Sequence, residues 1–247
     1  MQEKEDVYFF IFRNKKSRRP LLLLIFLLVF SSTEAMAALS YTHLDNGTSS
    51  GGSITTNSIS VSANQLVIIV FSAYRSSSGG AIGALSVTYN GTSTSMTSIT
   101  SQIITHATGV TRDGDIAAYY LVPSGSSSGT ITIQLSATAD DFIWSTFYFT
   151  GENTTTPIVQ NATGGFGCNG MNTCTSRPSN LTNPIASNDA TVAGFIVYNQ
   201  TITAGSGYST IDNAADTINQ LAEYEITGTQ PPAADHGSSG SAFRLVL

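Results

Sequence analysis

Residues 65–74 read QLVIIVFSAY and residues 141–150 read DFIWSTFYFT, and these two stretches decide the fold. Both are rich in β-branched and aromatic residues, which are enriched in strands. The six successive apolar residues at 66–71 predict a central strand. A strand over 141–150 would present two faces, because successive side chains alternate. One face would carry Phe142, Trp144, Thr146 and Tyr148.

The rest of the chain repeats this pattern at lower intensity. Short runs of β-branched and apolar residues alternate with Gly, Ser, Asn and Pro clusters about every ten residues. Further strands are expected at 39–44, 53–61, 84–89, 97–105, 115–122, 130–135, 156–160, 180–185, 191–198, 220–227 and 242–247. Only residues 213–221 suggest a helix. The sequence therefore predicts an all-β fold, a two-sheet antiparallel β-sandwich of about ten strands that is jelly-roll-like.

The first 37 residues have the layout of a secretory signal peptide. Five Arg and Lys residues at positions 13–19 precede ten apolar residues at 21–30, and Ala35-Met36-Ala37 provides an A-x-A cleavage site. The apolar run is far shorter than the roughly 20 residues of a spanning helix. We therefore expect a signal peptide at 1–37, a single domain at 38–247, and a secreted, extracellular or cell-surface protein; an uncleaved anchor is the alternative.

The charge of the chain limits the classes of partner that it can bind, and its cysteines suggest a disulfide. Residues 38–247 contain four basic residues, all Arg, and twelve acidic ones. Nucleic-acid binding needs a basic surface, so this partner is excluded, and insertion into a membrane is not expected after cleavage. The two cysteines, Cys168 and Cys174, are expected to form a local disulfide in an oxidising compartment.

Three phrases suggest a family. They are LSVTYNG at 85–91, YYLVPSG at 119–125 leading into GTITI at 129–133, and FTGENTTTPI at 149–158. The chain resembles a jelly-roll module of secreted bacterial, archaeal and phage-type surface proteins. The resemblance implies a surface or adhesive context, and it supplies no catalytic residues because such modules share no known activity.

Trp144 and Tyr148 are the candidate ligand-binding residues. Their shared face could form an aromatic platform for sugar rings, which would make the chain a carbohydrate-binding module or lectin. A strand buried on both faces is the competing interpretation.

Calcium is the one cofactor the sequence suggests. Asp113 and Asp115 flank a glycine, and Asp140 and Asp141 are adjacent, each pair beside a predicted strand. Carboxylates clustered in turns suit Ca²⁺. Aspartates that simply form turns explain the same pattern.

Glu223 and Glu225 are two of the three glutamates after residue 37. Two residues apart in a strand, they would point to one face with their Cα atoms about 7 Å apart. Paired carboxyl groups can hydrolyse glycosides, so a glycan-active hydrolase is a minor alternative.

The favoured hypothesis is a secreted, non-catalytic structural or adhesive protein, such as a self-assembling subunit of a filament or matrix. Leu39, Tyr41 and Leu44 lie in the predicted first strand, which could complement a sheet of a neighbouring copy. The expected partners are accordingly copies of the same chain, as a homo-oligomer, filament or matrix, or an extracellular glycan.

Overall fold

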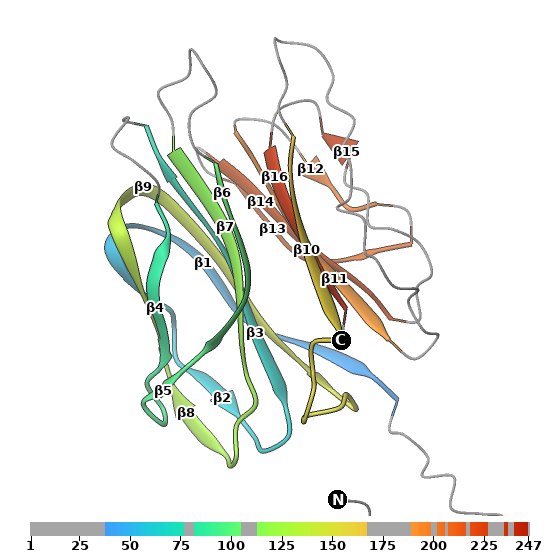
Figure 1. Ribbon diagram of the computed structural model, residues 1–247. Coiled ribbons are helices and arrows are strands. Elements are labelled where there is room, and N and C mark those ends of the chain that lie inside the picture. Colours follow the sequence, from blue (N-terminus) through green and yellow to red (C-terminus); the bar gives the residue numbers. More distant parts are fainter. Residues whose placement is uncertain are drawn as a thin grey trace, which may run out of the picture. The chain divides into compact units, whose positions relative to one another are not determined.

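The computed structural model describes residues 38–76, 82–104, 113–166, 189–198, 202–205, 207–215, 218–226, 235–236 and 240–246. Contacts group Ala37–Leu247 into one compact unit. Every regular element in the described ranges is a β-strand (Figure 1). The strands are β1 (Ser40–Thr55), β2 (Ile59–Val61), β3 (Leu66–Arg75), β4 (Ala84–Tyr89), β5 (Thr94–Ser95), β6 (Thr97–Ile104), β7 (Asp113–Leu121), β8 (Ser127–Gly129), β9 (Ile131–Thr150), β10 (Gln160–Phe166), β11 (Ala190–Tyr198), β12 (Ile202–Thr203), β13 (Ser209–Ala215), β14 (Ile218–Ile226), β15 (Asp235–His236) and β16 (Gly240–Val246).

The first sheet is organised by β9. Its order is β5-β4-β9-β3-β7-β6, and β1 also pairs with β9. Strand β1 runs antiparallel along β9, from Ser40 opposite Thr150 to Thr55 opposite Thr132. On its other side β9 pairs with β4 near one end and with β3 near the other. Residues 130–135 and 141–150, predicted as two strands, thus belong to one strand of 20 residues.

Strand β3 separates two hydrophobic cores. Val67, Ile69 and Phe71 enter the inner core, which β3 and β9 form with residues of β1, β2, β4 and β7. The alternate residues of β3 enter the intersheet core, which lies between the first sheet and β11, β13 and β14. The unbroken apolar sequence of β3 follows from this, because both of its faces are buried.

The second sheet has the order β10-β16-β11-β14-β13, and all of its pairs are antiparallel. Figure 1 shows these mostly orange and red strands beside the first sheet. Their inner face closes the intersheet core through Val192, Ile196 and Ala222. The outer face carries a small cluster of Ala193, Phe195 and Leu221 with Ile202. The predicted antiparallel, sandwich-like all-β class is confirmed.

The type and number of the secondary-structure elements differ in part from those predicted from the sequence. The described residues of the stretch 213–221, for which the sequence suggests a helix, lie in β13 and β14, and these two strands pair antiparallel. Tertiary pairing overrides the helix propensity of its Ala and Gln residues there. The described part of the chain holds sixteen strands rather than about ten, because β2, β5, β8, β12 and β15 are too short to show in the sequence pattern. Within it no helix is long and apolar enough to cross a membrane.

Candidate functional site

Trp144 is part of the inner core. Its side chain is 6% exposed, and its indole N–H donates a 2.9 Å hydrogen bond to Oδ2 of Asp45. Tyr148 shares its face and packs, partly buried, against the same core. A buried ring cannot stack on a sugar, so the expected Trp144 platform is absent, and the interpretation of a strand buried on both faces describes 141–150 correctly.

The predicted assembly strand is paired within its own chain. Tyr41 lies on β1 and stacks on Tyr224 of β14, with ring centroids 4.3 Å apart. Leu39 packs against the intersheet core and Leu44 against the inner core. The side of β1 that faces β9 is therefore occupied, and the side chains of these three residues pack within their own chain in this conformation.

The aspartates expected to hold calcium lie on different faces. Asp115 is buried in the first sheet on the side of Phe71, whereas Asp141 is buried on the side of the intersheet core, where it accepts a hydrogen bond from the N–H of Ile218. Asp140 is exposed and accepts hydrogen bonds from Ser76. The described residues form no group of three or more His, Cys, Asp or Glu side chains suited to a metal ion. The side chain of Asp113 lies outside the described part, as do Cys168 and Cys174 with their predicted disulfide.

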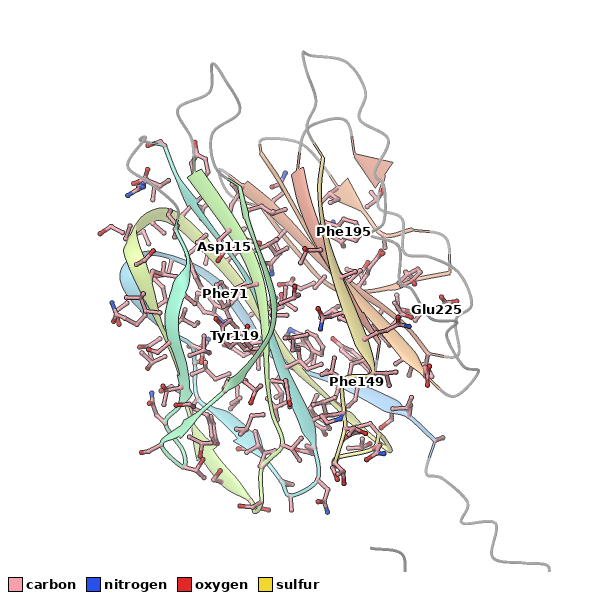
Figure 2. All side chains as sticks on the ribbon, viewed as in Figure 1. Phe71, Asp115, Tyr119, Phe149, Phe195 and Glu225 are labelled. Atoms are coloured by element: carbon pink, nitrogen blue, oxygen red, sulfur yellow. The ribbon has the colours of Figure 1, made fainter. Side chains whose placement is uncertain are left out.

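Asp115 of β7 is a buried carboxyl group in the first sheet. Its carboxyl group is fully buried, and desolvation raises its pKa to about 7, although the N–H of Ile116 partly offsets this. Figure 2 labels Asp115, Phe71 and Tyr119, which belong to neighbouring strands of this sheet. Tyr119 stacks on Phe71 at 5.9 Å between ring centroids. Asp115 is surrounded by core side chains, so we do not assign it a role in binding a ligand.

Glu223 and Glu225 form the best candidate site. Both lie on β14 and, by alternation, on the face that also carries Leu221, which is the outer face of the second sheet. The shared face predicted from their spacing is therefore present. Figure 2 shows Glu225 on the second sheet, well separated from Asp115. The register places Thr191 of β11 directly opposite Glu225.

The side chains of Glu223, Glu225 and Thr191 are largely enclosed. Glu223 and Thr191 are fully buried. The N–H of Gly205 donates a 2.9 Å hydrogen bond to Oε2 of Glu223. In the described part of the chain Glu223 Oε1, Glu225 Oε2 and Thr191 Oγ1 have no hydrogen-bond partner.

Burial controls the protonation of Glu223. Desolvation raises the pKa of Glu223 to about 7, and the charge of Glu225 raises it further, whereas the Gly205 hydrogen bond lowers it. A carboxylic acid that stays protonated near neutral pH can donate a proton, and an ionised neighbour can accept one. The pair thus has the elements of acid–base chemistry.

Sequence reasoning found the two glutamates but missed Thr191 and Gly205. Thr191 is 32 positions from Glu223 and joins the site only through the β11–β14 register. No local motif indicates that register. Gly207 also approaches the site, since a Cβ there would lie 3.4 Å from Oε1 of Glu225, and its φ of +88° favours glycine.

Fold and site together define a class: an antiparallel, sandwich-like all-β protein with a buried glutamate pair on the outer face of its second sheet. Comparison with known proteins adds no narrower assignment. No family model matches the chain, and no curated protein or solved structure shows significant similarity to it. The jelly-roll topology stays a prediction.

Proposed function

We propose that this chain is a secreted, non-catalytic structural or adhesive protein that assembles with copies of itself. The free edge of β1 is the observation that carries the proposal. Among the described strands β1 pairs only with β9, so its second edge presents unpaired backbone groups. Unpaired edges are templates for strand addition by another chain.

Apart from three register shifts, the sequence of β1 does little to protect this edge. Proteins blunt exposed edges with Lys, Pro, charge and bulges. Strand β1 contains no Lys or Pro, and its one carboxylate, Asp45, is engaged by Trp144 and Asn57. Three register shifts interrupt the strand, which leaves Asp45–Ser49 as its longest regular segment.

A second copy is the occupant that this edge suits best. The edge is made mostly of Ser, Thr, Gly and Asn, which carry no charge. Residues 38–247 carry a net negative charge, so two copies repel one another as wholes, and β1 with its single carboxylate adds little to this repulsion. Antiparallel pairing of β1 with β1 of a second copy would satisfy both edges.

Charged substitutions on β1 test the assembly. Asn46→Lys with Thr48→Lys changes two exposed positions and would place like charges at the joint. Ser124→Lys with Ser126→Lys makes the same charge change at exposed positions outside β1 and serves as the control. We expect the wild type and the control to form oligomers or filaments in light scattering and negative-stain microscopy, and the β1 variant to be monomeric. A monomeric wild type at every concentration, or an unaffected β1 variant, contradicts the proposal.

Export is tested separately. The proposed leader at 1–37 predicts that protein recovered outside the cell begins at Ala38. Amino-terminal sequencing decides this, and retention of the leader on cell-associated protein would instead support an uncleaved anchor.

The glutamate pair favours a second candidate function, a glycan-active hydrolase. This function requires a glycan to reach Glu223, which is fully buried. A protonated Glu223 would then act as the acid and Glu225 as the base or nucleophile. Reducing-end release from a panel of polysaccharides should then fall to background in Glu223→Gln and in Glu225→Gln, while Asp140→Asn stays active. Turnover that survives both glutamine variants excludes this function.

A further inference from the structure

A polar bridge crosses the intersheet core. Ser145 of β9 donates a 2.7 Å hydrogen bond from its hydroxyl to Oδ2 of Asp212, on β13. The same hydroxyl oxygen accepts a 3.2 Å hydrogen bond from Nε2 of Gln220, on β14. The bridge thus joins one strand of the first sheet to two strands of the second.

Two of the three residues of this bridge are shielded from water. Ser145 and Gln220 are fully buried, whereas Asp212 is partly exposed. A register shift in β13 between Thr210 and Asp212 sets Asp212 opposite Ala222, on the face that meets the first sheet. Bulges of this kind re-aim side chains beside functional sites.

In these contacts Ser145 has the place of a nucleophile, Asp212 that of a base and the carboxamide of Gln220 that of an electrophile. A serine hydroxyl bonded to a carboxylate can lose its proton as it attacks. Nε2 of Gln220 is bonded to the carboxamide carbon, so that carbon lies one bond beyond the 3.2 Å contact. The terminal torsion of Gln is broad, so rotation about the Cγ–Cδ bond, which leaves the carbon in place, can turn the face of the carboxamide toward the serine oxygen.

We propose that Ser145 and Gln220 form an intramolecular ester that links the two sheets covalently. The Oγ atom of Ser145 bonds to Cδ of Gln220 while Asp212 takes the hydroxyl proton. The Cδ–Nε2 bond then breaks, and the leaving nitrogen receives that proton from Asp212 and departs as ammonia. Atoms and charge balance, and no oxidant or cofactor is needed.

Two features of the site favour this reaction. Oε1 of Gln220 has no hydrogen-bond partner in the described part of the chain and stays in place as the ester carbonyl oxygen, so the reaction breaks no hydrogen bond to this atom. Asp212 reaches the surface, which gives ammonia an exit. Once formed, the ester is shielded from hydrolysis because both of its residues are fully buried.

Mass spectrometry of the purified full chain under reducing conditions tests the ester. The wild type should be lighter than its sequence by one ammonia, whereas Ser145→Ala and Asp212→Asn should match their sequence masses. Asp212→Asn keeps the side-chain shape, so it remains informative if Ser145→Ala fails to fold.

Peptide mapping locates the bond. Cleavage before aspartates should give a branched peptide that joins residues 141–188 to residues 216–234. Asn46-Gly47, Asn90-Gly91 and Asn169-Gly170 can also lose ammonia, as succinimides, but a succinimide does not join two peptides. The proposal is overturned if the folded wild type has the full mass of its sequence. It is also overturned if the loss of ammonia is confined to linear peptides, or if the ester persists in Asp212→Asn.

Discussion

The indole N–H of Trp144 donates its hydrogen bond to a carboxylate of β1, Oδ2 of Asp45, at 2.9 Å. Asp45 also accepts a 2.8 Å hydrogen bond from Nδ2 of Asn57, in the segment between β1 and β2. One carboxylate thus joins β9, β1 and the chain that follows β1. The only tryptophan of the chain is an anchor of the inner core rather than a binding surface.

Removing the indole should therefore destabilise the fold. We expect Trp144→Ala to lower the free energy of unfolding by about 3–5 kcal/mol, because large-to-small changes in a core leave a cavity. The measurement is urea denaturation followed by circular dichroism. Leu85→Ala, at a side chain that is 70% exposed, is the control and should change stability by less than about 0.5 kcal/mol. Equal effects of the two substitutions would contradict the assignment of Trp144 to the core.

The same indole leaves no room for a side chain at Gly47. A Cβ at Gly47 would collide with the ring of Trp144, whereas a Cβ at Gly52 would make an ordinary 3.8 Å contact with Thr138. We expect Gly47→Ala to cost about 1–3 kcal/mol, as overpacking does. Gly52→Ala, on the same strand, should cost much less. The cost of Gly47→Ala should also shrink in a Trp144→Phe background, which a double-mutant cycle measures.

Stability should fall as the pH rises from about 5 to 7. Burial raises the pKa of both Asp115 and Glu223 to about 7, so both are protonated in the folded chain at pH 5. The unfolded chain has already lost these protons, and stability falls wherever the unfolded state binds fewer protons. Each group should contribute on the order of 1–3 kcal/mol to the change between these pH values. Burial of Glu152 raises its pKa too and acts in the same direction.

Single variants separate these contributions. Asp115→Asn and Glu223→Gln should each flatten the dependence of the unfolding free energy on pH between 5 and 7. Asp140→Asn should leave this slope unchanged, because hydrogen bonds from Ser76 lower the pKa of Asp140 and move its titration out of the range. A slope identical in all four proteins would show that neither buried carboxyl group is responsible.

The contact between Tyr41 and Tyr224 should couple β1 to the second sheet. Their rings are stacked at 4.3 Å, and aromatic pairs contribute about 0.5–1.5 kcal/mol beyond area burial. A double-mutant cycle with Tyr41→Leu and Tyr224→Leu should give a coupling energy in that range. A cycle in which the two substitutions are additive would mean that β1 docks without this pair.

The sequence predicted those features that depend on alternation and local composition. Both faces of 141–150 and the shared face of Glu223 and Glu225 follow from a period of two, and the structure has them. The central position of β3 follows from its apolar run.

Features that depend on pairing between distant strands could not be predicted from the sequence. Thr191 faces Glu225 only because β11 pairs with β14 in one register. The separation of Asp115 from Asp141 depends on which face of the first sheet each one enters. The burial of Trp144 depends on Asp45, which lies 99 positions earlier.

A strand buried on both faces cannot be positioned by hydrophobicity alone. In most strands a slip of one residue exposes the apolar set to solvent and is rejected. In β3 such a slip would exchange Leu66, Ile68 and Val70 with Val67, Ile69 and Phe71, and both sets are apolar. Side-chain volume and the ladders on its two sides must therefore set the register of β3, so this strand should tolerate exchanges between apolar residues of similar volume far better than the insertion or deletion of a single residue.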